Sequence, residues 1–131
     1  MSTGLDMNFS RRIFLIAGIY GLIALLPQYL MEDKVGTDYP PAITHPEYFY
    51  GFLGVAVAWQ IAFLIVSRDP VRYRAMMIPG IVEKSGFGFA AIMLYAQGRL
   101  SGLMFAAGLL DIVFAAFFVV AFIRTPTSLE L

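Results

Sequence analysis

The chain has 131 residues, of which 60% are hydrophobic, nine are basic and nine are acidic. Its mean hydropathy is +0.77, and its apolar fraction exceeds the roughly 45–50% typical of soluble domains. The balanced charge argues against a nucleic-acid partner. The absence of cysteine and the single histidine, His45, exclude disulfides, thiol catalysis and a multi-histidine metal or haem site within one chain. We therefore expect one transmembrane domain over residues 1–131, with no metal and no cofactor.

Four apolar runs are long enough to form membrane-spanning helices, each of which needs about 20 residues. They lie at about residues 13–30, 48–66, 76–95 and 100–123. Residues 1–10 are polar and are predicted to form a frayed tail. Residues 31–46 are predicted to form a polar loop, because Pro40 and Pro41 disfavour helix. The fold class that we expect is all-α, an integral membrane four-helix bundle with up-down-up-down topology.

The basic residues are predicted to orient this bundle. One group falls on a single side of the predicted spans, and it comprises Arg11, Arg12, Arg68, Arg72, Arg74 and Arg124. Lys34 and Arg99 fall on the other side. The positive-inside rule then places both termini in the cytoplasm, at a bacterial inner membrane. Ser10-Arg11-Arg12 also resembles a twin-arginine export signal, but the long apolar run after it favours a retained first span.

Two short motifs mark the ends of predicted spans. Thr44 followed by Glu47 has the spacing of a capping box at the start of the second span, with Pro46 in the first turn. His45 and Glu47 are alternatively an acid/base pair or half of a metal site, and the capping box is the preferred interpretation. Residues 97–99, which include Gly98, are predicted to form a tight turn.

Polar residues inside the spans are the candidate functional residues, because ionisable groups at membrane depth are costly and need partners. Glu83 and Lys84 lie in the third span and Asp111 lies near the middle of the fourth. We expect Lys84 to pair with Asp111, and Glu83 to lie near Gln60 or Tyr20 as a proton donor or acceptor. The candidate catalytic residues are Glu83 and Asp111, and the candidate ligand-binding residues are Tyr20, Trp59, Gln60 and Lys84.

Small residues predict which helix faces point inward, because they allow helices to approach closely. Those that share a face with the polar groups are Gly86 and Ala90 (with Glu83), Gly88 and Ala91 (with Lys84), Ala107, Gly108 and Ala115 (with Asp111), and Ala17 and Ala24 (with Tyr20). The outward, lipid-facing residues of the third span are predicted to be Ile78, Val82, Phe89 and Ile92. A strip of small residues in the second span, Gly51, Gly54, Ala58 and Ala62, is predicted to serve packing within the bundle or self-association. Trp59 and Gln60 are about 100° apart on their helix, so the sequence leaves open which of them is innermost.

The segments HPEYFYGFLGVAVAWQ and SRDPVRYR resemble small bacterial four-helix membrane proteins. The general plan is also similar to DoxX-like proteins and to the EXPERA group of sterol isomerases and sigma-2-type receptors, which share four spans, intramembrane carboxylates and a tryptophan. The resemblance implies the fold, and it assigns no catalytic residue.

Three functions follow from this pattern. The first is an inner-membrane protein whose polar pocket binds or isomerises a small lipophilic ligand. The second is a structural or accessory subunit of a membrane complex or homo-oligomer, in which the buried charges only fix helix packing. The third is a proton or ion path, which is disfavoured because the polar residues cluster at one depth.

Overall fold

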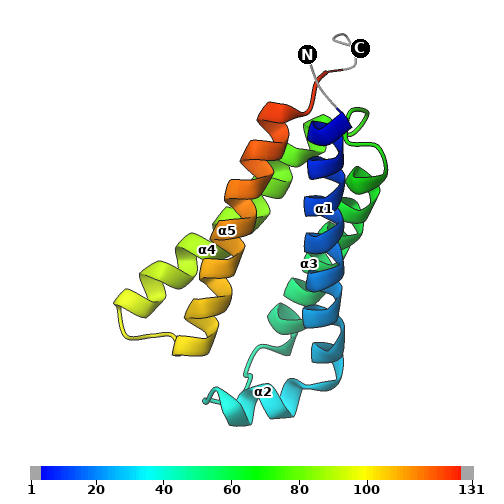
Figure 1. The fold of residues 1–131 in the computed structure, drawn as a ribbon. Coiled ribbons are helices and arrows are strands. Elements are labelled where there is room, and N and C mark those ends of the chain that lie inside the picture. Colours follow the sequence, from blue (N-terminus) through cyan, green and yellow to red (C-terminus); the bar gives the residue numbers. More distant parts are fainter. Residues whose placement is uncertain (1–3, 128–131) are drawn as a thin grey trace.

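The computed structural model describes residues 4–127, and this part of the chain folds into helices (Figure 1). In chain order they are α1 (Gly4–Leu25), η1 (Leu26–Leu30), α2 (Glu32–Asp38), α3 (Pro46–Arg68), η2 (Arg74–Met76), α4 (Met77–Ala96) and α5 (Gly102–Arg124). Within the described residues, four helical segments are long and apolar enough to cross a membrane, and they are Met7–Leu30, Pro46–Arg68, Arg74–Ala96 and Gly102–Arg124. The fold is thus all-helical with four long apolar helices, as the sequence predicts.

The start of α1 differs from the prediction, because residues 4–10 are helical rather than a tail. Contacts with α5 explain the difference. The hydroxyl groups of Ser10 and Thr125 share a hydrogen bond of 2.6 Å, and the ring of Phe9 meets that of Phe117 edge-on at 6.3 Å. These partners lie more than 100 positions away, so the local sequence carries no signal for them. Residues 1–3 of the predicted tail lie outside the described residues.

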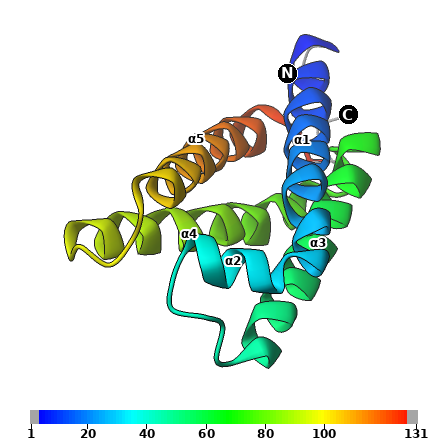
Figure 2. The same ribbon diagram turned by 90° about the horizontal axis from the view of Figure 1, so that it is seen from below.

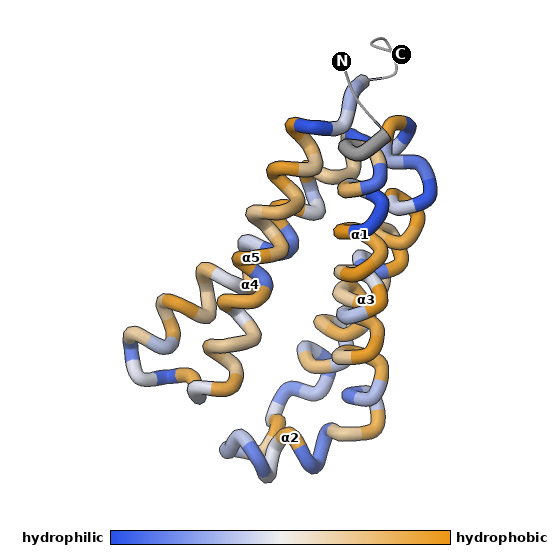
Figure 3. Tube along the Cα trace, in the orientation of Figure 1, coloured by the Kyte–Doolittle hydropathy of each residue, from blue (hydrophilic) through white to orange (hydrophobic). Residues whose placement is uncertain are grey.

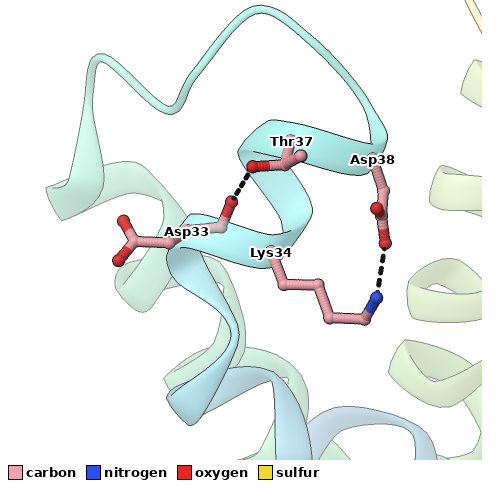
Figure 4. A network of polar contacts seen from close by, with 4 residues as sticks. All are labelled: Asp33, Lys34, Thr37 and Asp38. Carbon is pink, nitrogen blue, oxygen red and sulfur yellow. Dashed lines mark hydrogen bonds and ion pairs between the residues drawn. The ribbon is translucent and has the colours of Figure 1, made fainter.

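The predicted polar loop also contains a helix, α2. Local side-chain interactions stabilise it (Figure 4): Lys34 Nζ pairs with Asp38 Oδ2 at 2.9 Å, and Thr37 Oγ1 donates a hydrogen bond to the Asp33 carbonyl oxygen. The hydrogen bond to Asp38 and the charge of its carboxylate raise the pKa of Lys34. Pairs four residues apart stabilise helices, and the prolines expected to prevent a helix follow only after α2 has ended.

At the starts of α3 and α5, one predicted cap is wrong and one predicted turn is confirmed. Helix α3 begins at Pro46, but its N-cap is His45 and no side chain caps it, so the predicted Thr44 capping box is wrong. Glu47 instead lies 3.3 Å from His45 on the surface. The turn before α5 has Gly98 at a φ of 69°, which only glycine adopts without strain. Ser101 then caps α5 by accepting a hydrogen bond from the amide of Met104.

The long helices form two antiparallel pairs. Helix α1 lies along α3, and α4 lies along α5 (Figures 1 and 2). The pairs meet where α1 begins and α5 ends, and they diverge toward α2 and the α4–α5 turn. At the end where they meet, Arg74 Nε donates hydrogen bonds to the carbonyl oxygens of Phe122 and Thr125 at 3.1 and 2.7 Å. The predicted clustering of arginines at one end is supported by Arg74 and by Arg124, whose guanidinium lies 5.5 Å from the Phe9 ring.

An aromatic core joins the two pairs close to this end. Phe14 stacks on Phe118 with ring centroids 4.1 Å apart, and Phe63 meets Phe118 edge-on at 5.0 Å. All three side chains are fully buried. These rings come from α1, α3 and α5, so a single cluster fixes three of the long helices relative to one another. Such aromatic pairs add about 0.5–1.5 kcal/mol each beyond their area burial.

The outer surface of the helices is strongly apolar. In Figure 3 hydrophobic residues dominate the long helices, while hydrophilic residues gather at the two ends of the molecule. The predicted outward orientation is confirmed for the four residues of α4, because Ile78, Val82, Phe89 and Ile92 are all exposed. In the predicted strip of small residues on α3, Gly51, Gly54 and Ala58 are exposed and do not serve packing within the described fold, whereas Ala62 is half-buried.

Candidate functional site

A cavity of about 260 Å³ lies between the two helix pairs, where they begin to diverge. All four long helices contribute to its walls. Its polar lining comes from Tyr20, Gln28, Gln60, Glu83, Lys84 and Asp111, and its apolar lining includes Phe52, Ala56, Phe87, Met104 and Ala107. Five of the six residues predicted to form the site are therefore brought together around one space.

Lys84 lies between two carboxylates. Its Nζ atom is 3.8 Å from Glu83 Oε2 and 3.8 Å from Asp111 Oδ1. The side chains of Lys84, Asp111 and Glu83 are 4%, 16% and 21% exposed, respectively. The predicted pair of Lys84 and Asp111 is present, but both contacts exceed the 2.7–3.2 Å of a direct hydrogen bond. The site thus holds its charges close together without locking them into fixed hydrogen bonds.

Two aromatic rings lie near the ammonium group of Lys84. Lys84 Nζ lies 5.4 Å from the ring centroids of both Phe63 and Phe114. The face of an aromatic ring attracts a cation at this distance, and the attraction strengthens when water is excluded. The aromatic core of the fold therefore helps to accommodate the buried charge of the site.

The two adjacent residues Glu83 and Lys84 differ in environment because neighbouring positions on a helix point about 100° apart. Lys84 shares the buried face of α4 with Gly88 and Ala91, as predicted. Gly86 and Ala90 are exposed, so the face predicted to carry Glu83 inward points outward instead. Glu83 consequently lies at the edge of the cavity, where it is reached from two sides.

Gln60 is the innermost polar residue of α3, with 1% of its surface exposed. Its Nε2 atom donates a hydrogen bond of 2.9 Å to the carbonyl oxygen of Ala56. Its side chain packs directly against Gly21 of α1, where a β-carbon would collide with the amide group. Gln60 Oε1 and Glu83 Oε2 are buried and have no hydrogen-bond partner. Burying a polar atom in this way costs free energy, so the two atoms single out this region as a candidate functional site.

Tyr20 and Trp59 occupy different environments. Tyr20 lines the cavity and packs against Phe114 with ring centroids 5.6 Å apart. Trp59 does not line the cavity. Its ring lies 6.2 Å from that of Phe63, and its outer side borders a surface groove that Glu83 also lines. The alternative left open by the sequence is thus settled in favour of Gln60 as the inner residue.

The sequence analysis missed several residues that line the cavity, and three of them show why. Phe52 and Phe87 line the cavity from α3 and α4, but a phenylalanine in an apolar helix gives no distinguishing signal. Gly21 was missed because its role is to admit the side chain of Gln60 from another helix. The sequence did carry one signal: Gly18 and Gly21 are three residues apart, and both face α3. Glycines at this spacing indicate that α1 and a neighbouring helix approach closely.

The donor set limits the chemistry of the site. Two carboxylates, one ammonium group, two carboxamides and one phenol can bind the polar end of a ligand, and the ionisable groups among them can exchange a proton with it. Among residues 4–127, no cluster of three or more His, Asp or Glu side chains is placed to hold a metal ion. His45 and Glu47 are exposed and do not line the cavity; they contact each other, and the His45 ring also lies 5.5 Å from that of Tyr48.

Comparison with known proteins gives no match to a protein family, to a curated protein or to a solved structure.

Proposed function

We propose that the chain is a multi-pass membrane protein whose four long helices cross the bilayer in an up-down-up-down arrangement. Their length and hydropathy support this proposal, as does the exposure of large apolar side chains along all four helices, such as Ile23, Val55, Val82 and Leu103. Contiguous apolar surface of this extent is unfavourable in water and favourable in lipid. The arginine-rich end then faces the cytoplasm, which in a bacterium makes the bilayer the inner membrane.

Within that membrane, we infer that the cavity between the helix pairs binds a small lipophilic molecule. The observation that carries this inference is the combination of mostly apolar walls with a convergent group of polar side chains at one place. Binding sites for small molecules have this composition. The apolar walls would contact the body of the ligand, and Glu83, Lys84 and Asp111 would contact its polar end.

Glu83 is the side chain best placed for proton transfer to or from such a ligand. It borders the cavity and is less buried than Lys84, which lies between the two carboxylates. Asp111 balances the charge of Lys84, so Glu83 can change its protonation state while one ion pair persists. A positioned carboxyl group is a suitable general acid or base for an isomerisation.

Fluorescence of Trp59, the only tryptophan in the chain, tests the binding proposal. The purified protein is titrated with a long-chain alcohol brominated near its hydroxyl group, because bromine quenches tryptophan emission at short range. We expect saturable quenching in the unmodified protein. Ala107→Phe fills the cavity and should abolish the saturable component.

Ala106→Phe is the matched control, because Ala106 is the adjacent residue of α5 and is exposed. It should leave the saturable quenching unchanged. Equal quenching in both variants would contradict the binding proposal. That outcome would favour the second function, an accessory subunit whose charges only fix packing, which the mutual pairing of Lys84 and Asp111 supports.

A further inference from the structure

A groove of about 560 Å³ runs along the outer surface between α3 and α4. Phe52, Ala56, Glu83 and Phe87 line this groove, and the same four residues line the cavity between the helix pairs. The groove and the cavity therefore lie on the two sides of these side chains. Gly51, Val55 and Trp59 line the groove but not the cavity.

The groove continues along the same outer surface toward the basic end of the molecule. A neighbouring hollow is lined by Val55, Trp59, Ile78, Val82 and again by Glu83. Val55, Ile78 and Val82 are among the exposed apolar residues of the candidate spans. In a bilayer these residues face acyl chains, so this part of the groove is in contact with lipid.

We propose that the groove between α3 and α4 is the entrance to the cavity, and that the ligand is a molecule dissolved in the bilayer that enters sideways from the lipid. This inference rests on the proposed binding function and adds the route and the class of ligand to it. Phe52 and Phe87, one from each helix, form the boundary that the ligand must pass. Two grooves at the basic end, bordered by Arg12 and by Arg68, share no lining residue with the cavity.

The positions of the three charged residues agree with this route. Glu83 lines the cavity, the groove and the adjoining hollow, whereas Lys84 and Asp111 line only the cavity. A polar group that enters from the groove therefore meets Glu83 first and the Lys84–Asp111 pair afterwards. This order also accounts for the greater exposure of the Glu83 side chain.

A single cysteine in the cavity provides a test, because the natural sequence has none. Ala107→Cys is reconstituted into phosphatidylcholine vesicles and treated with N-dodecylmaleimide, which partitions into the bilayer, or with a charged maleimide, which stays in water. The thiol adds across the maleimide double bond, and its proton moves to the neighbouring carbon. We expect the lipophilic reagent to react many times faster than the charged one.

Gly51→Leu in the Ala107→Cys background is the decisive variant. A β-carbon at Gly51 meets no atom within 4 Å, so a side chain can be added there, and leucine narrows the groove, which Gly51 lines, at a position outside the cavity lining. We expect modification by N-dodecylmaleimide to slow several-fold. Gly86→Leu is the matched control, since Gly86 is an exposed helical glycine that also has open space around it and does not line the groove. It should leave the rate unchanged.

Val55→Phe enlarges a second residue that lines the groove but not the cavity, and it should slow the reaction as Gly51→Leu does. It replaces Gly51→Leu in the test if the leucine variant is poorly folded. If N-dodecylmaleimide modifies Gly51→Leu, Val55→Phe and Gly86→Leu at equal rates, the proposed entrance is contradicted, while the proposal that the cavity binds a ligand is unaffected. An unreactive thiol in Ala107→Cys itself would overturn it too. If the unmodified protein shows no saturable quenching of Trp59, the binding function on which the entrance depends is refuted instead.

Discussion

The charge of Lys84 is stabilised by its immediate neighbours rather than by solvent. Two carboxylates lie 3.8 Å away, two aromatic rings border the ammonium group, and the side chain is 4% exposed. Removing one partner of a buried pair is strongly destabilising, because the remaining charge loses its compensation, whereas replacing both partners with apolar groups is often tolerated. The three charged residues of the site should therefore respond differently to mutation.

Lys84→Met should lower the free energy of unfolding by about 3–5 kcal/mol, the usual cost of breaking a buried pair. Asp111→Leu should cost less, because Glu83 still balances Lys84. The double variant should be more stable than the sum of the two losses predicts. Glu83→Gln should change stability little, since Asp111 remains as the partner of Lys84. Thermal melting in detergent measures all four, and strictly additive losses would show that Lys84 and Asp111 do not interact.

Gly21 and Gln60 should behave as a second coupled pair. A β-carbon at Gly21 would collide with the carboxamide of Gln60, so Gly21→Ala should destabilise the protein by about 1–3 kcal/mol through overpacking. Gln60→Ala removes the colliding atoms, and Gly21→Ala in that background should cost much less. Melting curves of the two single variants and the double variant test this coupling. If Gly21→Ala lowers stability by the same amount with and without Gln60→Ala, the loss arises from a contact other than that with Gln60.

Between elements, the contact of α4 with α5 depends on glycine. A β-carbon at Gly108 would collide with that of Ala91, and one at Gly88 would collide with Ile112. Gly108→Leu should therefore separate the two helices and lower the free energy of unfolding by about 1–3 kcal/mol. Gly102→Leu is the control in the same helix, because a β-carbon there meets nothing within 4 Å. Similar melting temperatures for the two variants would contradict the close packing of this pair.

The sequence predicts the four long helices because each is a long apolar run, and the observed ends lie within a few residues of those predicted for α3, α4 and α5. Residues 4–10 and α2 were missed for different reasons. Ser10 is ordered by a partner in α5, and α2 by the pairing of Lys34 with Asp38. Regular apolar runs reveal neither kind of contact.

Helix rotation was harder to predict than helix position, because helices that are apolar on all sides give no clear inward stripe. The polar residues supplied that signal for Lys84, Asp111 and Tyr20. For Glu83 the predicted inward face was wrong, because the adjacent Lys84 points about 100° away and takes the buried face. For Trp59 and Gln60, which are also adjacent, the sequence left the inner residue undecided. The division into two helix pairs, which creates the cavity, depends on the fit of Gly21, Gly88 and Gly108 to other helices.

At the scale of the whole molecule, the two helix pairs are held together at one end and diverge at the other (Figure 1). The aromatic core and the hydrogen bonds of Arg74 to α5 lie at the joined end. The cavity lies where the pairs begin to separate, so its walls come from both pairs. Because the cavity and the α3–α4 groove share four lining residues, a small rotation of one pair about the joined end would alter both together.

The proposed orientation in the membrane predicts which residues a reagent reaches from each side. Thr37 in α2 and Gln97 in the α4–α5 turn are exposed at the diverging end, whereas Asn8 and Ala75 are exposed at the joined, arginine-rich end. Four single-cysteine variants are made, Thr37→Cys, Gln97→Cys, Asn8→Cys and Ala75→Cys, and no native cysteine interferes. In intact cells a membrane-impermeant maleimide should label the first two only. It should label the other two after the membrane is permeabilised, because positively charged ends stay in the cytoplasm. The opposite pattern would invert the orientation, and labelling of all four in intact cells would mean that the helices do not cross the bilayer.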